Sequence, residues 1–513
     1  MYFRGFDSRA EIKNRLRPFN LQALSFTNTR KDRTMYRIGL DIGTTSICGV
    51  LFDTDSGMLV KSITRRNDSA LRADVPGARL QDPARAVEIA KTVLRELLEC
   101  GRADSIGLTG QMHGIVYVDA NGKAVSPLYT WQDGRGNLLY KDGLTYAEYF
   151  SEQTGTGAST GYGAVTHFYN TVNGLVPEGA VSIATAGDYV AMALAGRSRP
   201  VLHPTNAASI GAYDLEGKCF MLDRLESCGL DASFFPQITH GGKAAFIGEA
   251  TTGIPVAAAI GDNQAALFDA VGMSEDVLSV NVGTGSQVSC IASGDAAAKF
   301  AQKKAKITGG DVELRPYFGG RNIAVGAALC GGRAYALLAD LFRETVERIA
   351  GFEPSPEMVY DAMDKAVRSH RETLKLLRPP AGDPAFSNDA SLANDACISS
   401  APVVNTAFSG TRANPQKRGA IGNIGTDNFT MGTLAAGFSE GIATELLTLY
   451  NAIKPFAASE HRELVGAGNG LRLNPTLCDC ITETFGLELT MPESREEAAL
   501  GAALLAGMES KGI

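Results

Sequence analysis

Two segments of the chain share one pattern, in which an apolar run, a short turn of glycine and hydroxyl residues, and a second apolar run follow one another. The first segment is 36–53 (YRIGLDIGTTSICGVLFD), and the second is 277–292 (VLSVNVGTGSQVSCIA). Each pattern predicts a strand, a tight turn and a second strand. Because both halves of the chain contain this unit, the simplest explanation is a duplicated fold.

Between these segments, apolar positions alternate between strand and helix spacing. Residues 83–100 carry apolar side chains near helical spacing and predict a helix, whereas 105–109 and 115–118 predict short strands. Strands and helices continue to alternate up to Ala265, which is typical of an α/β domain. In the second half we expect a helix of small residues over 324–342, a loop or insertion over 379–400, and helices over 432–450 and 496–507.

The length of 513 residues favours two domains, which we place at 35–263 and 264–513. Residues 1–34 are rich in Arg and Lys and are expected to be a disordered extension outside the fold. This segment fits either a transit peptide or an upstream extension of the reading frame, and Met35, directly before the first strand, favours the latter.

Composition excludes several classes of protein. A net charge of −8 without a basic domain argues against nucleic-acid binding. No apolar run approaches the roughly 20 residues of a membrane helix. The nine cysteines have no repeated spacing, which favours reduced thiols in a cytoplasmic protein over a metal or redox centre.

The two glycine turns are the candidate phosphate sites. Glycine lets the backbone approach a ligand closely, and hydroxyl and turn N–H groups donate hydrogen bonds to anionic oxygen. The chain has no Gly-x-x-x-x-Gly-Lys-Ser/Thr motif and no Gly-x-Gly-x-x-Gly after a strand. A phosphate site must therefore be built from the two turns, one on each side of a polyphosphate.

Asp262 is the candidate base, within the segment 261–266 (GDNQAA). It follows an apolar run and precedes a helix of small residues, so it lies at the end of a strand. A carboxylate in this position is either a helix N-cap or a base that reaches a substrate hydroxyl. The residues alone leave both roles open.

With three further motifs, these segments resemble the FGGY carbohydrate kinases, from Tyr36 to Gly507 and in the order of that family. The motifs are Gly-Gln-Met-His-Gly at 110–114, Trp131-x-Asp133-x-Arg135, and Ser409-Gly410-Thr411-Arg412 with Pro415, Arg418 and Gly419, before the closing small-residue segment 497–503. The resemblance implies an α/β fold of two ribonuclease-H-like (actin-like ATPase) domains with a cleft between them.

The resemblance also implies a role for each motif. Asp262 would be the general base and Asp41 would help to hold Mg²⁺. The residues implied to bind ATP are Thr44, Thr45, Ser46, Gly283, Thr284, Gly326, Gly466, Gly468 and Asn469. The residues implied to line the sugar pocket are Gln111, Met112, His113, Trp131, Asp133, Asp262 and Asn263.

The expected substrates are ATP and a ketose, bound by a monomer or a homodimer. Glycerol kinases carry Arg-Glu where this chain has Met112-His113, which argues against glycerol. The Gly-Thr-Arg-x-x-Pro form within 408–434 resembles sedoheptulokinases, whereas xylulokinases usually carry Gly-Glu-Arg-x-Pro. We therefore expect sedoheptulose 7-phosphate as the product, with D-xylulose phosphorylation as the alternative. The alternative from another functional class is a non-catalytic regulator of the same fold that binds sugar or ATP.

Overall fold

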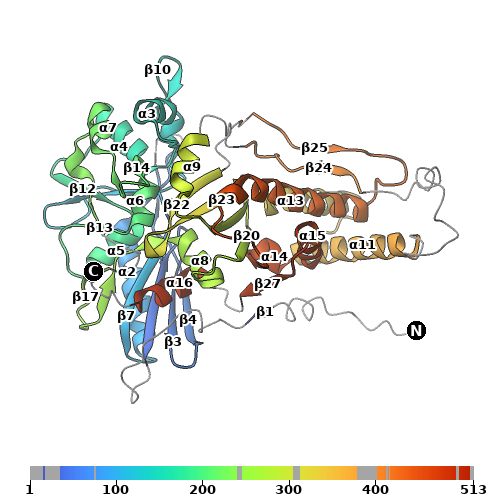
Figure 1. Ribbon diagram of the computed structural model, residues 1–513, viewed down its shortest axis with the longest axis horizontal. Coiled ribbons are helices and arrows are strands. Elements are labelled where there is room, and N and C mark those ends of the chain that lie inside the picture. The colour runs from blue at the N-terminus through green and yellow to red at the C-terminus, as the bar shows by residue number, and fades with distance from the viewer. Residues whose placement is uncertain are drawn as a thin grey trace.

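The computed structural model describes residues 16–17, 35–73, 75, 77–239, 245–303, 312–377, 401–411, 414, 416–492 and 496–508. In this part of the chain each half contributes one large mixed sheet (Figure 1). The first sheet has the order β17-β18-β7-β2-β3-β4, with β19 also paired to β7. Its strands are β2 (Tyr36–Ile42), β3 (Ser46–Asp53), β4 (Met58–Arg66), β7 (Ala103–Gly110), β17 (Phe246–Glu249), β18 (Pro255–Ala257) and β19 (Ile260–Gly261).

The second sheet has the order β1-β27-β26-β20-β21-β23-β22. Its strands are β1 (Leu16–Arg17), β20 (Val277–Val282), β21 (Ser286–Ile291), β22 (Val312–Pro316), β23 (Asn322–Ala328), β26 (Glu463–Ala467) and β27 (Leu489–Pro492). Two residues of the N-terminal extension therefore join the edge of this sheet, parallel to β27. The remainder of 1–34 lies outside the described residues, as does the predicted loop at 379–400.

Some helices of each half pack on its large sheet, and others of the first half form a separate cluster with short strands (Figure 1). Those of the first half are α2 (Pro83–Leu98), α3 (Tyr146–Thr154), α4 (Gly163–Val172), α5 (Ala186–Leu194), α6 (Pro204–Ile210) and α7 (Leu222–Ser227). Those of the second half are α9 (Ala296–Lys303), α10 (Gly332–Ala350), α11 (Pro356–Leu377), α13 (Met431–Ile453), α14 (Asn469–Arg472) and α15 (Pro475–Phe485). Two more, α8 (Asp262–Val271) and α16 (Glu497–Ala506), lie between the sheets.

Short strands outside the two large sheets form smaller sheets of two or three strands. They are β5 (Ala70–Leu71) with β6 (Leu80–Gln81) and β9 (Leu128–Tyr129), β8 (Val116–Asp119) with β12 (Ala180–Ala184), β10 (Leu139–Lys141) with β11 (Leu144–Thr145), β13 (Val201–Leu202) with β16 (Gln237–Ile238), β14 (Tyr213–Asp214) with β15 (Cys219–Phe220), and β24 (Val403–Asn405) with β25 (Ala420–Gly422).

Both predicted strand–turn–strand units are confirmed. β2 pairs with β3 antiparallel up to Ile42 opposite Ile47, and β20 pairs with β21 up to Val282 opposite Ser286. The helix predicted over 83–100 is α2, which Asp82 caps by accepting a hydrogen bond from the N–H of Ala84. Its apolar face is buried against the first sheet, as its sequence spacing indicates.

The helix predicted over 324–342 is wrong in its first part. Ala324–Ala328 belong to β23, which pairs with both β21 and β22, and α10 begins only at Gly332. Small apolar residues fit a strand that is buried on both faces as well as a helix, so periodicity did not separate the two structures. The predicted domain boundary at 263–264 falls inside α8.

Glycines allow α16 to lie very close to its neighbours. A side chain on Gly39 of β2 or Gly107 of β7 would overlap the backbone carbonyls of Ala499 and Ala502 in α16. A side chain on Gly501 of α16 would overlap the carbonyl of Ala265 in α8. The first sheet, α16 and α8 are therefore in direct backbone contact, within a core that also includes residues of the second sheet.

This packing predicts that Gly107→Ala destabilises the protein. The new methyl group would overlap the Ala502 carbonyl and lie 3.1 Å from the Cβ of Ala506, so α16 must move. Overpacking of this kind costs about 1–3 kcal/mol. Urea unfolding should show a lower midpoint with an unchanged slope. Gly157→Ala is the control, because that exposed glycine has no atom within 4 Å of the added carbon. Equal midpoints for the two variants would contradict the close packing.

Candidate active site

Three parallel strands of the first sheet end side by side and bring three polar side chains together. Ile42 of β2 pairs with Gly110 of β7, and Gly110 pairs with Gly261 of β19. Asp41, Gln111 and Asp262 are next to these positions. The carboxyl ends of parallel strands are the usual place for a ligand in α/β sheets. The structure thus joins motifs that lie more than 200 residues apart.

The first glycine turn begins at the same edge. Asn67 holds it from behind, because its side-chain amide donates to the carbonyl of Gly43 at 2.8 Å and its N–H donates to that of Thr45 at 2.9 Å. Thr45 is exposed, and Thr44 and Ser46 are partly exposed. The turn is therefore rigid at its base and open at its hydroxyl groups.

The second turn packs on the start of α10. The N–H groups of Gly331, Gly332 and Arg333 donate to the carbonyls of Thr284, Gly283 and Thr284, each at 3.0 Å. A side chain on Gly332 would overlap the carbonyl of Gly283. Gly283 and Thr284 are themselves exposed. The Gly331–Gly332 pair was not identified from the sequence. The signal that could have revealed it is a pair of glycines at the junction between a strand and a helix.

The 466–470 segment lies against this second turn. Gly468 (φ 89°) precedes α14, and a side chain on either Gly468 or Gly470 would come within 2.6 Å of the Val282 carbonyl. Asn469 is exposed at the first position of α14. The structure therefore brings the two predicted ATP-binding segments of the second half together.

Two of the glycines predicted to bind ATP, Gly326 and Gly466, are closely packed inside the second domain. A Cβ on Gly326 would lie 2.8 Å from the Cβ of Leu449 in α13, and one on Gly466 would lie 2.8 Å from Leu471 Cδ1. Both glycines are buried in the middle of strands. Their small size is explained by a helix or side chain pressed onto the sheet, and their contact with a nucleotide stays a prediction.

Carboxylates dominate the electrostatics of the edge. Burial, followed by the negative charges of Asp262 and Glu496, raises the pKa of Asp41 to about 7. Burial also raises the pKa of Asp262 to about 6, while the N–H of Asn263, at 2.7 Å from Oδ1, and the charge of Arg315 act in the opposite direction. Glu496, which precedes α16 and accepts a hydrogen bond from Thr64, was not identified from the sequence.

On the sugar side, Met112 and His113 take different roles. Met112 is buried and lies against Gly261, directly before Asp262. His113 has an unusual φ of 72°, and its ring stacks on Tyr162 with centroids 4.4 Å apart. Its Nδ1 is 2.8 Å from the carbonyl of Ser209, so Nδ1 carries the proton and Nε2 is the acceptor in the neutral ring. Tyr162 is a further residue that sequence reasoning missed.

Asp133, which is predicted to line the sugar pocket, forms a buried ion pair. It is fully buried, and its two oxygens accept hydrogen bonds from the side chain and backbone of Arg135 and from the N–H of Arg79. This buried ion pair supports the loop that carries Trp131, whose side chain is 46% exposed. The motif therefore combines one accessible residue, Trp131, with one buried residue, Asp133.

Arg315 is a candidate site residue that had no sequence signal. It lies on β22 of the second sheet, where Gln264 of α8 donates to the carbonyl of the next residue, Pro316, at 3.3 Å. Its side chain is 13% exposed, and its Nε donates to Glu313 at 2.8 Å. Its charge lowers the pKa of Asp262, so the second half contributes a cation to the edge formed by the first.

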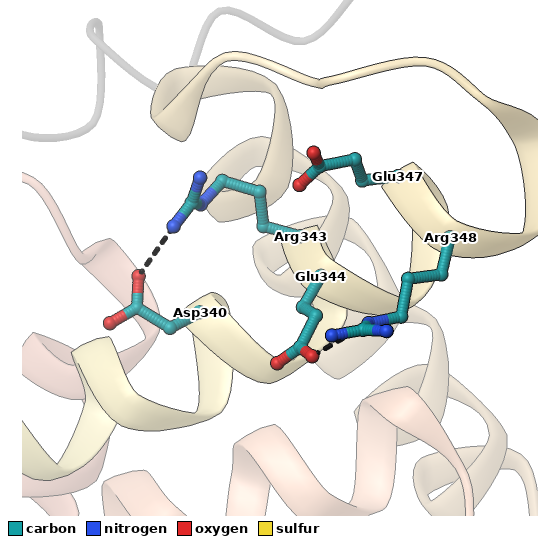
Figure 2. Close-up of a pocket in the computed structure, with 5 residues that line it drawn as sticks. All are labelled: Asp340, Arg343, Glu344, Glu347 and Arg348. Carbon is teal, nitrogen blue, oxygen red and sulfur yellow. Dashed lines mark hydrogen bonds and ion pairs between the residues drawn. The ribbon is translucent and has the colours of Figure 1, made fainter.

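A separate surface hollow lies on α10 and has the character of a solvated helix face (Figure 2). Its lining residues are Asp340, Arg343, Glu344, Glu347 and Arg348. They pair along one helix face, Arg343 with Asp340 at 3.6 Å and Arg348 with Glu344 at 2.8 Å. None of the predicted site residues belongs to it.

The described residues form neither a membrane span nor a metal-binding cluster. None of their helices is both long and apolar enough to cross a membrane. They also contain no group of three or more His, Cys, Asp or Glu side chains that could hold a metal ion.

Comparison with known proteins agrees with this geometry. Models of the N-terminal and C-terminal domains of the FGGY family of carbohydrate kinases match residues 36–269 and 359–510. Sedoheptulokinase from Mus musculus is 26% identical over 91% of this chain and 96% of its own. Glycerol kinase from Alteromonas mediterranea is 25% identical over 92% of this chain and 90% of its own. Xylulose kinase from Rhodospirillum rubrum superposes with a TM-score of 0.71 at 20% identity, covering 93% of this chain and 91% of that one.

The architecture is thus the two-domain, actin-like ATPase fold, and its chemistry is ATP-dependent phosphoryl transfer to a sugar. The chain belongs to the FGGY family of carbohydrate kinases.

The placement of Arg315 predicts a change in pH dependence. In Arg315→Met the loss of positive charge should raise the pKa of Asp262 above its value of about 6. Since the base acts as the carboxylate, the acid limb of kcat/KM should move to higher pH and the rate at pH 6 should fall. Arg321→Met is the control, because Arg321 pairs with Glu275 instead. An acid limb at the same pH in wild type and Arg315→Met would remove Arg315 from the site.

Proposed function

We propose that the protein phosphorylates a primary hydroxyl of a ketose, with sedoheptulose as the substrate and sedoheptulose 7-phosphate as the product. The observation that carries the proposal is the placement of Asp262 beside Asp41 and Gln111 at one sheet edge. The near full-length match to a sedoheptulokinase supports the choice of ketose. So does the 408–434 segment, although Arg412 and Pro415 of its motif lie outside the described residues.

The two halves divide the work in this proposal. Residues 35–263 bind the sugar, and 264–513 bind the nucleotide, with α8 as the junction. Gln111, Met112, His113, Trp131 and Asn263 surround the sugar, while Arg315 and Tyr162 add donors that sequence reasoning did not include. A longer ketose has more hydroxyl groups than D-xylulose, and the guanidinium of Arg315 has several N–H donors for them.

Asp262 acts as the general base for the attacking hydroxyl. With a pKa of about 6 it is largely ionised at neutral pH. It is also the first residue of α8, and its Oδ1 is held by the N–H of Asn263. That bond fixes the carboxylate while leaving its other oxygen to receive the proton. Phosphoryl transfer has a loose transition state, so a moderate base in the right position is sufficient.

Asp41 fits a role in holding Mg²⁺. Burial raises its pKa, and the negative charges of Asp262 and Glu496 raise it further, so a cation beside Asp41 would stabilise the carboxylate form. Mg²⁺ in nucleotide sites typically takes one or two carboxylates, with phosphate oxygens and water as the other ligands. When bound, the ion neutralises charge on the phosphates. Thr44, Thr45 and Ser46 then contact the terminal phosphate, and Gly283 and Thr284 contact the phosphates from the second half.

Asp262→Asn tests the base. The amide oxygen can still accept the bond from Asn263, so the start of α8 should be preserved, but the side chain no longer takes a proton. General-base assistance is typically worth about 10²–10⁴-fold, and kcat should fall by this factor. Binding of ketose and of an ATP analogue, measured by calorimetry, should change little. Asp223→Asn, at an exposed position of α7, is the control. A kcat above a tenth of wild type would reassign Asp262 to a structural role.

The choice of ketose is tested by one coupled assay with two sugars. A site that hydrogen-bonds the extra hydroxyls penalises a shorter substrate, because its buried polar groups stay unpaired. We expect kcat/KM for sedoheptulose to exceed that for D-xylulose by about ten-fold or more. A preference for D-xylulose would overturn the choice of substrate while leaving the role of Asp262 intact.

A further inference from the structure

The hydroxyl of Thr44 belongs to the phosphate turn but bonds to the sugar side of the site. Its Oγ1 donates to Oε1 of Gln111 at 3.4 Å and accepts from Nε1 of Trp131 at 3.1 Å. A hydroxyl has a single proton to donate. While that proton lies on Gln111, it is not available to a phosphate oxygen. The bond is long, so a better donor can displace it easily.

Gln81 of β6 fixes the direction of this bond. A carbonyl only accepts, so the carbonyl of Thr44 requires the Nε2 end of Gln81, which lies 2.7 Å away. Oε1 of Gln81 therefore faces Gln111 and accepts from its Nε2 at 2.8 Å. This in turn directs Oε1 of Gln111 at the hydroxyl of Thr44. One backbone carbonyl thus sets both amide orientations.

The hydrogen-bonded ring of Thr44, Gln81 and Gln111, here called the relay, is largely buried and lies between the predicted phosphate and sugar sites. Gln81 and Gln111 are each 4% exposed, so only a small part of either side chain is accessible. Trp131, in contrast, is 46% exposed. The relay begins and ends on Thr44 and passes through the residue assigned to the sugar pocket.

We propose that Gln81 is a positioning residue that couples sugar binding to phosphate binding. A sugar hydroxyl that donates to Oε1 of Gln111 displaces the hydroxyl of Thr44, which then donates to the terminal phosphate. Without sugar, the phosphate turn lacks this donor, and ATP is held less well for attack by water. The inference rests on the proposed sugar pocket but not on the identity of the ketose.

Trp131 provides a direct measurement, because it is the only tryptophan in the chain. Its emission should report the affinity for a non-hydrolysable ATP analogue with Mg²⁺, with and without saturating sedoheptulose or D-xylulose. In the wild type we expect the ketose to tighten analogue binding about five-fold or more, as is usual for coupled sites. In Gln81→Met, which removes the amide, the two affinities should agree within about two-fold.

Gln81→Glu is the sharper variant, because it keeps the shape but places a carboxylate oxygen against the Thr44 carbonyl. It should also lose the coupling. Gln237→Glu, at an exposed position of β16, makes the same chemical change elsewhere and should retain it. Thermal melting identifies a variant that fails to fold. In that case Thr44→Val, which removes only the hydroxyl at nearly constant volume, takes its place and should lose the coupling.

Wild-type coupling in Gln81→Met and Gln81→Glu, or in Thr44→Val, would overturn the proposal. So would a wild type in which neither ketose changes analogue affinity. These measurements need no turnover. A protein that shows the coupling but phosphorylates neither ketose would therefore contradict the proposed function and leave the role of Gln81 intact.

Discussion

The contact that the site depends on is the backbone packing of α16 between the first sheet and α8. Gly39 and Gly107 remove side chains from the sheet, and Gly501 removes one from the helix, so the elements touch directly. α8 starts at Asp262, and the sheet ends at Asp41 and Gln111. The distance between Asp262 and the first glycine turn is therefore set by close packing, which tolerates little change. A helix from the far end of the chain thus positions a residue in its middle.

That packing also concentrates negative charge. Burial raises the pKa of both Asp41 and Asp262, and at Asp41 the negative charges of Asp262 and Glu496 raise it further. Arg315, from the second sheet, opposes this effect at Asp262. The imbalance at Asp41 suits a cation that arrives with the nucleotide, because an ATP site must accept both a metal and a highly charged phosphate chain. Burying these carboxylates destabilises the folded protein without ligands, and the same carboxylates serve the proposed reaction.

Buried polar side chains lie behind the accessible residues of the candidate site and hold them in position. Asp133 forms a buried ion pair with Arg135 and thereby supports the loop of Trp131. Gln81 similarly orients Gln111 without reaching the surface. In both cases a buried polar side chain has its hydrogen bonds satisfied by neighbours, as burial requires. Such residues act through the geometry of others.

The sequence predicted the two strand–turn–strand units, the helices α2, α8, α13 and α16, and the family, because these follow from local periodicity and from motifs contiguous in the chain, while its assignment of Asp262 as the base stays a prediction. It did not separate the strand at Ala324–Ala328 from a helix, since small apolar residues suit both. It also predicted that Gly326, Gly466 and Asp133 bind the ligands, which stays a prediction, whereas their packing against α13, Leu471 and Arg135 came only from the structure. Only the tertiary structure decided this packing and revealed Arg315, Tyr162 and Gln81. Burial and partnership depend on contacts between residues far apart in the chain, and local patterns carry no information about them.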